Sequence, residues 1–152
     1  MLGSRIGKYR IVALLGEGGM GAVYKAIHEE LQREVAIKVL HAKFATRDDM
    51  MTRFKNEARA ANIVKHPSLV EIYDTDRLPD GSIYLVMELL DGEALDSLLE
   101  RRGSQLPLKR VLRIGWQLAD ALTAVHSKNI VHRNLKPSNV MLVRDSVVPG
   151  GE

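Results

Sequence analysis

The feature that most constrains the fold is the glycine-rich stretch "GEGGMG", residues 16–21, which lies between two runs of apolar and β-branched residues. These runs, residues 9–15 and 22–27, predict two strands. Because the second run continues as a strand, the glycines fall in a β-hairpin, whereas a dinucleotide fingerprint needs a helix at that point. The sequence also lacks G-x-x-x-x-G-K-[ST], which excludes a P-loop.

Gly16, Gly18 and Gly21 follow the spacing G-x-G-x-x-G. A backbone without side chains can approach phosphate oxygens closely enough for its amides to bind them. Val23, just beyond the loop, would then cover an adenine ring. The same spacing also fits a glycine-rich hairpin that binds nothing, so other residues must decide between the two interpretations.

A third strand is predicted at residues 33–40, and a helix at residues 46–65, where apolar residues recur at helical spacing. Thr46 is a suitable cap for this helix. Two more strands, within residues 69–78 and 82–90, flank a turn at Pro79, Asp80 and Gly81. The pattern therefore predicts an α+β unit with five strands and one helix between the third and the fourth strand.

The pattern becomes helical after residue 90. A short helix is predicted at residues 94–101, and Pro107 opens a long one that spans residues 106–126. The long helix carries an apolar face made of Val111, Leu112, Gly115, Leu118, Ala119, Leu122 and Val125. We place a boundary near residues 90–93 and expect two parts, residues 1–90 and residues 91–152.

The composition is that of a globular protein, with 45% hydrophobic and 27% charged residues among 152. The net charge is +3, and the lysines and arginines are scattered, so we expect no nucleic-acid partner. The lack of cysteine excludes disulfides and thiolate metal sites, and favours a reducing, cytoplasmic setting. No apolar run is long enough to cross a bilayer and no signal-type segment opens the chain, so we expect no membrane association.

Two charged residues suit the binding of a phosphate group. Lys38 ends "VAIK" on the third strand, where alternation places it on the same face as Ala36. Glu57 lies in the predicted helix, where it would form an ion pair with Lys38 and hold the ammonium group toward phosphate. Each residue alone also fits a solvated surface charge, but their occurrence together with the glycine loop favours a nucleotide site.

The stretch "IVHRNLKPSNVML", residues 130–142, resembles the catalytic loop of protein kinases. With G-x-G-x-x-G-x-V, V-A-I-K, the helix glutamate and the hinge in the same order, the chain resembles bacterial serine/threonine protein kinases from Tyr9 to Met141. The resemblance implies a kinase small lobe, with a five-stranded antiparallel sheet and one helix, followed by the first helices of the helical large lobe.

The resemblance also implies ATP and magnesium as cofactors. It assigns Lys38, held by an ion pair with Glu57, to the phosphates and Asn139 to a magnesium ion, while Lys136 matches the serine/threonine class. Met87 would lie at the back of the pocket, and the backbone of Glu88 and Leu90 would bind the adenine edge. The full set of residues expected at the nucleotide is Leu15, Gly16, Glu17, Gly18, Gly19, Met20, Gly21, Val23, Ala36, Lys38, Met87, Glu88, Leu90 and Met141.

The chain departs from the family at two points. Asn134 stands where the family has the aspartate that accepts the hydroxyl proton of the substrate. An amide cannot take up this proton at neutral pH, and loss of a positioned base costs on the order of 10²- to 10⁴-fold in rate. The second departure is that no D-F-G precedes Glu152, and Asp145 is better explained as a loop charge than as a substitute metal ligand. We therefore expect the chain as given to be unable to transfer phosphate.

Without the rest of the large lobe, the helix at residues 106–126 lacks cover, and each large apolar side chain left in water forfeits roughly 1.5–3 kcal/mol. We therefore expect self-association or a protein partner over this helix. The alternative function is that of an interaction scaffold that has the kinase shape and binds no nucleotide. A third possibility is that the chain is a piece of an active enzyme.

Overall fold

The computed structural model describes residues 2–18, 21–45, 52, 56, 62–103 and 105–144. The chain divides into two compact units. The first consists of Met1–Lys65 and Val70–Leu89, and the second of His66–Leu69 and Leu90–Glu152.

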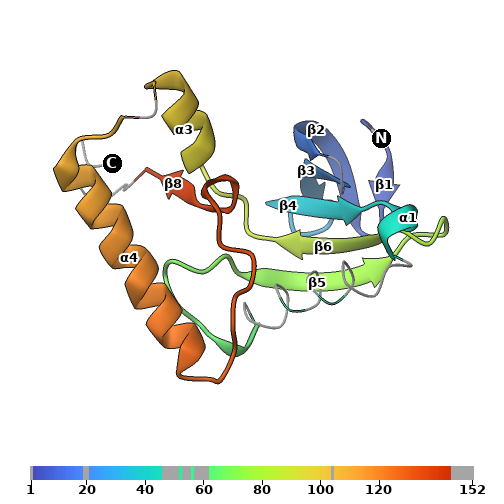
Figure 1. Ribbon diagram of the computed structural model, residues 1–152. Helices are drawn as coiled ribbons and strands as arrows, with labels where there is room; N and C mark the ends of the chain where they lie inside the picture. The colour runs from blue at the N-terminus through green and yellow to red at the C-terminus, as the bar shows by residue number, and fades with distance from the viewer. Residues whose placement is uncertain are drawn as a thin grey trace. The chain divides into compact units, whose positions relative to one another are not determined.

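The first unit contains a six-stranded sheet of order β1-β2-β3-β4-β6-β5, in which all neighbours are antiparallel (Figure 1). Its strands are β1 (Arg5–Ile6), β2 (Tyr9–Gly18), β3 (Gly21–His28), β4 (Arg33–Leu40), β5 (Ile72–Arg77) and β6 (Ile83–Met87). The five predicted strands are confirmed. The two-residue strand β1, which pairs with the start of β2, was not predicted.

A single helical turn, α1 (Ala42–Ala45), follows β4 and was not predicted. Within the helix predicted at residues 46–65, the structure describes Thr52, Asn56 and residues 62–65. Of these, Thr52, Asn56, Asn62 and Ile63 are helical. The other residues of the predicted helix, Glu57 among them, lie outside the described residues.

The core of the first unit forms on both faces of β4. Val35, Ile37 and Val39 lie on one face, in a cluster with Tyr84 and Val86 of β6. The opposite face has a smaller cluster made of Leu40, Ile83 and Leu85, against which Phe44 and Ile72 pack. Because β4 is central, its apolar residues are buried on both faces, which fits the nearly continuous apolar run in its sequence.

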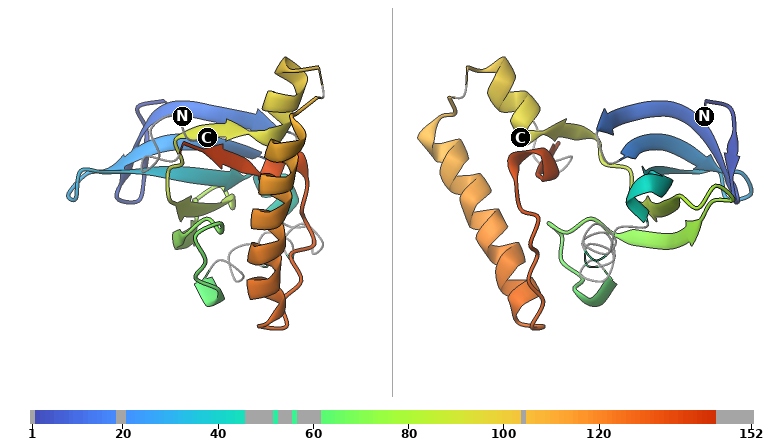
Figure 2. Two further views of the ribbon diagram at one scale, coloured as in Figure 1. Left: turned by 90° about the vertical axis from the view of Figure 1, so that its left-hand side faces the viewer. Right: turned by 45° about the vertical axis from the view of Figure 1, so that its right-hand side comes forward.

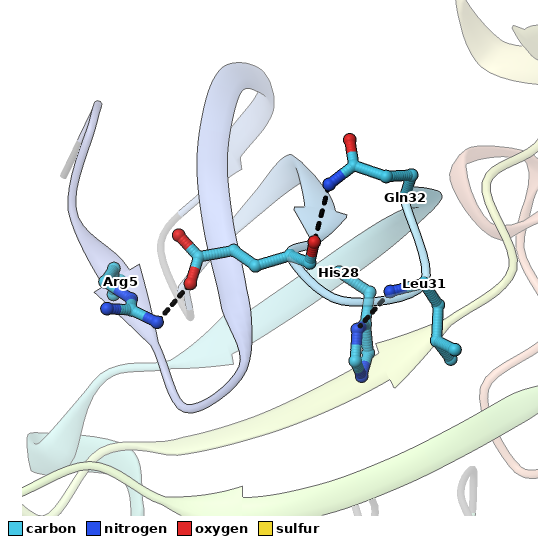
Figure 3. Close-up of polar contacts among 5 residues, drawn as sticks. Arg5, His28, Leu31 and Gln32 are labelled. Atoms are coloured by element: carbon cyan, nitrogen blue, oxygen red, sulfur yellow. Dashed lines mark hydrogen bonds and ion pairs between the residues drawn. The ribbon is translucent and has the colours of Figure 1, made fainter.

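The connection between β3 and β4 is a tight turn joined to β1 (Figure 3). The carboxylate of Glu29 forms an ion pair with Arg5. The backbone carbonyl of Glu29 accepts a hydrogen bond from the Gln32 side chain at 2.5 Å. The Leu31 amide donates to Nδ1 of His28 at 3.2 Å, while Gln32 adopts a positive φ of 52°. These contacts stabilise the turn between β3 and β4, and β4 begins directly after it at Arg33.

The second unit contains β7 (Gly92–Ala94), α3 (Leu95–Arg101), α4 (Leu108–His126), the 3-10 helix η1 (Pro137–Asn139) and β8 (Met141–Val143). The two predicted helices are confirmed, with Pro107 at the N-cap of α4. After α4 the chain turns and runs back alongside the helix toward β8 (Figure 2). There β8 pairs with β7 as a two-stranded antiparallel sheet, a pairing that was not predicted.

The predicted apolar face of α4 is only partly buried. Ala121 and Val125 are buried and Leu118 and Leu122 are half-buried, whereas Val111, Leu112 and Ala119 are exposed. Leu108 and Trp116 are exposed as well. The C-terminal half of α4 therefore packs against the rest of the second unit, whereas most apolar side chains of its N-terminal half are exposed. Among the described residues, no helix combines the length and the apolar character that a bilayer crossing needs.

We expect Ile37→Ala to destabilise the first unit strongly, because Ile37 is 0% exposed at the centre of the larger cluster. The expected loss is about 2–5 kcal/mol in the free energy of unfolding, measured by urea denaturation. Leu31→Ala is the matched control, since Leu31 is 71% exposed. Equal midpoints for the two variants would contradict this description of the core.

Candidate functional site

The register of the sheet gathers the predicted nucleotide residues of the first unit on one face. Gly16 of β2 lies opposite Val23 of β3, Val23 lies opposite Lys38 of β4, and Lys38 lies opposite Leu85 of β6. Residues directly opposite one another in antiparallel strands share a face. Gly16, Val23, Lys38 and Leu85 therefore form one row across four strands.

A second row lies beside the first. Ala36 is two residues from Lys38, so strand alternation places it on the same face, and Met87 lies opposite it on β6. Ala36 is 6% exposed and Met87 is half-buried. The two rows thus bring together five predicted residues: Gly16, Val23, Ala36, Lys38 and Met87. Leu85 was missed, although its spacing of two residues from Met87 could have indicated it.

The glycines of the loop differ in their surroundings. A Cβ built on Gly16 or Gly18 would meet no atom within 4 Å, whereas a Cβ on Gly21 would lie 1.9 Å from the Val39 carbonyl oxygen. Gly21 is therefore needed for the packing of β3 against β4, while Gly16 and Gly18 leave open space beside the hairpin. Gly19 and Met20 lie outside the described residues.

A register shift between Leu14 and Gly16 brings Gly16 opposite Val23. Leu15 is 51% exposed at this irregularity, and Glu17 is also exposed. Lys38 is half-buried on its row. Because Glu57 lies outside the described residues, its ion pair with Lys38 stays a prediction.

The Glu88 side chain is fixed by the residue before β5. Its Oε1 accepts a hydrogen bond from the Glu71 amide at 2.8 Å, and the Glu88 amide donates to the Glu71 carbonyl at 3.0 Å. These two bonds extend the β5–β6 pairing beyond Met87 and hold the chain where it leaves the sheet. Sequence reasoning singled out Glu88 but not Glu71, because the contact is between strands.

The second unit contains the segment with Asn134. The Asn139 side-chain amide donates to the Asn134 carbonyl at 2.8 Å, and the Asn134 amide donates to Nδ1 of His132 at 3.4 Å. Arg133, between them, has a φ of 58°, which is uncommon for a residue with a side chain and often marks a functional loop. His132 and Arg133 were not singled out in the sequence, because neither a turn nor a hydrogen bond of this kind leaves a periodic pattern.

Asn139 ends η1, and its backbone amide donates to the Lys136 carbonyl at 2.9 Å. Since its side-chain NH₂ is bound to Asn134, its side-chain oxygen is the atom suited to a metal ion. Lys136 is exposed, and Met141 on β8 lies opposite Ala94 and is 38% exposed. Leu90 is half-buried in the same unit. In the part of the chain that the structure describes, no group of three or more His, Cys, Asp or Glu residues is arranged to hold a metal ion.

We expect Asn139→Ala to loosen the Asn134 segment without unfolding the chain, because it removes a side-chain donor from an exposed loop. Amide hydrogen exchange at Asn134 and Val140 should become faster, with a loss of about 0.5–1.5 kcal/mol in local stability. Ser138→Ala, in the same turn, is the control. Unchanged exchange at Asn134 would contradict the role of this bond.

The protein kinase domain model matches residues 9–148 of the chain. The chain is 44% identical over 144 residues to the serine/threonine-protein kinase Pkn1 of Myxococcus xanthus, covering 95% of this chain and 20% of that protein. It is 40% identical over 144 residues to the serine/threonine-protein kinase PknH of Mycobacterium tuberculosis, covering 95% of this chain and 23% of that protein. The chain thus spans about a fifth to a quarter of the length of these curated relatives.

The crystal structure of the Mycobacterium tuberculosis PknI kinase domain is similar to this chain, with a TM-score of 0.82 and 31% sequence identity. The match covers 94% of this chain and 57% of that one. The sheet of the first unit and the first elements of the second correspond to a kinase small lobe and the start of the helical lobe. The chain belongs to the protein kinase family, among bacterial serine/threonine kinases.

Proposed function

We propose that this chain is a nucleotide-binding module of the serine/threonine kinase type. The observation that supports the proposal is the shared face of Gly16, Val23, Ala36, Lys38 and Met87, which the strand register assembles from four strands. This face combines open backbone for phosphate, a cation, and small or flexible apolar side chains that suit a flat base. The face thus offers groups suited to the phosphates of ATP and groups suited to its adenine base.

At the base, Val23, Ala36 and Met141 would contact the adenine ring, with Met87 behind it. The Glu88 amide is already bound to Glu71, so its carbonyl is the group that would accept from the adenine amino group. The Leu90 amide would donate to the ring. At the phosphates, Lys38, oriented by Glu57, would bind the oxygens together with the glycine-rich stretch. The residues of this stretch proposed to contact the nucleotide are Leu15, Gly16, Glu17, Gly18, Gly19, Met20 and Gly21.

Asn139 fits a magnesium ion only weakly. Its side-chain oxygen is a neutral ligand, while magnesium is usually held by carboxylates and phosphate oxygens together. A bound magnesium ion would neutralise charge on the phosphates. We therefore propose that ATP binding depends mainly on the loop and Lys38, with a small contribution from magnesium.

We further propose that the chain binds ATP without transferring its γ-phosphate. Asn134 can accept a hydrogen bond and so position a substrate hydroxyl, but its amide cannot remove the proton. In a protein with aspartate at this position and a complete metal site, the corresponding reaction would be phosphoryl transfer from ATP to serine or threonine. In that reaction, Lys136 would act at the transferred phosphate.

We propose the cytoplasm, where ATP is abundant, as the location of the module.

A second candidate function is that of an interaction protein that binds no nucleotide. It is favoured by α4, where Leu108, Leu112 and Trp116 are 72%, 63% and 69% exposed. Exposed apolar side chains in such proximity are typical of surfaces that associate with another copy or another protein. Self-association or a protein partner at α4 is also compatible with nucleotide binding. Calorimetric titration with ATP therefore discriminates between the two functions.

We expect calorimetric titration with ATP to show saturable binding that Lys38→Ala weakens roughly ten- to a hundredfold. This corresponds to the loss of about 1.5–3 kcal/mol from a hydrogen bond between charged groups. Lys8→Ala, which removes an exposed lysine before β2, controls for net charge. If the unmodified chain gives neither heat nor thermal stabilisation with ATP, with and without magnesium, the interaction protein becomes the better proposal.

We expect no transfer of radiolabel from [γ-³²P]ATP to serine- or threonine-containing peptides above the level of the Lys38→Ala variant. The physical reason is the missing proton acceptor at Asn134. Transfer that Lys38→Ala abolishes would refute the proposed inactivity while leaving the nucleotide site intact.

A further inference from the structure

Gly92 lies where two backbone segments come unusually close. A Cβ built on Gly92 would lie 2.2 Å from the carbonyl oxygen of Leu142, 2.9 Å from its carbonyl carbon and 3.0 Å from Cα of Val143. All three atoms belong to the main chain of β8, so no side chain can rotate away to make room. A residue with a side chain at this position must therefore displace β8 from β7.

The requirement for glycine at this position is one of space and not of backbone conformation. Gly92 is not among the described glycines with positive φ, which are Gly3, Gly7, Gly81 and Gly103. An alanine could adopt its dihedral angles, and only the contact with β8 opposes it. Gly115 in α4 is the natural comparison, since a Cβ there would meet no atom within 4 Å.

The position of β8 depends on β7 along its whole length. The register pairs Gly92 with Val143, Glu93 with Leu142, and Ala94 with Met141. Two further backbone bonds close the ends, from the Leu95 amide to the Val140 carbonyl at 2.8 Å and from the Arg144 amide to the Asp91 carbonyl at 3.3 Å. In Figure 1 β8 lies beside the chain that enters α3.

The strand β7 is itself held from α3. Nη2 of Arg101, at the end of α3, donates to both carboxylate oxygens of Glu93, at 2.7 Å and 3.0 Å. Leu98 of α3 is 0% exposed, which anchors the helix in the second unit. Because β7 is fixed on this side, we expect a clash at Gly92 to move β8, the strand that contributes Met141.

We propose that Gly92 is a positioning residue for the base of the bound nucleotide. Its lack of a side chain allows β8 to pair closely with β7. This pairing determines the position of Met141 relative to β7, and with it the position of Asn139, which precedes β8. The inference rests on the proposed function, because it assigns Met141 to the adenine ring. Gly92 itself contacts neither the base nor the phosphates in this proposal.

The test compares adenosine, ADP and ATP as ligands in calorimetric titrations of Gly92→Ala and Gly115→Ala. A displaced Met141 affects the base, which all three ligands share. Gly92→Ala should therefore weaken all three by a similar factor of about ten, as expected when a gap of roughly 0.5–1 Å removes part of the contact with the ring. Gly115→Ala should bind all three as the unmodified chain does.

Lys38→Ala provides the opposite pattern in the same experiment. Its loss of affinity should be small for adenosine and grow from ADP to ATP, since Lys38 is assigned to phosphate. If Gly92→Ala binds adenosine as tightly as the unmodified chain, or loses affinity for ATP alone, the inference is overturned and the proposed function stands. If the unmodified chain binds none of the three ligands, the proposed function fails, and the inference with it.

The thermal unfolding midpoint of each variant without ligand separates loss of fold from loss of position. If Gly92→Ala does not fold, hydrogen exchange in the unmodified chain replaces it. Saturating adenosine should then slow exchange at the Leu95 and Arg144 amides, which close the β7–β8 pair. Unchanged exchange at both amides, with adenosine bound, would overturn the inference.

Discussion

The structure of the first unit depends on the backbone register of β4 with its two neighbours. Because side chains alternate along a strand, Val35, Ile37 and Val39 form the core on one face while Ala36 and Lys38 lie on the other. The residues that fix the strand and the residues that form the site are thus consecutive in sequence. A shift of one residue would bury Lys38 in the core, so the apolar packing itself holds the candidate site in register.

The second unit positions its candidate functional residues differently. The buried apolar residues among its described members are few, namely Leu98, Ala121 and Val125. The segment from Asn134 to Arg144 is held instead by main-chain bonds to β7 and by the bond from Asn139 to Asn134. Such bonds depend on close approach of the backbone, and a methyl group added at Gly92 would oppose this approach.

Nucleotide binding and phosphoryl transfer place different demands on a kinase fold. The proposed binding depends on the face made of Gly16, Val23, Ala36, Lys38 and Met87, which the sheet assembles through the register of its strands. Transfer depends in addition on a proton acceptor, and Asn134 cannot serve as one. Under the proposed function the two capacities separate, because an amide at Asn134 would prevent transfer without altering the residues proposed to bind the nucleotide.

The sequence by itself determined the five longer strands of the sheet, the two later helices and the glycine hairpin, and it indicated the candidate site residues, because period, turn residues and motif order are local signals. Only the tertiary structure decided the strand β1, the β7–β8 pairing, the place of Leu85 beside Lys38, and the contacts of Glu88 with Glu71 and of Asn139 with Asn134. It also decided which half of α4 is buried. The β7–β8 pairing and the contacts of Leu85 and Glu88 join residues distant along the chain, and such pairings leave no periodic trace in either partner segment.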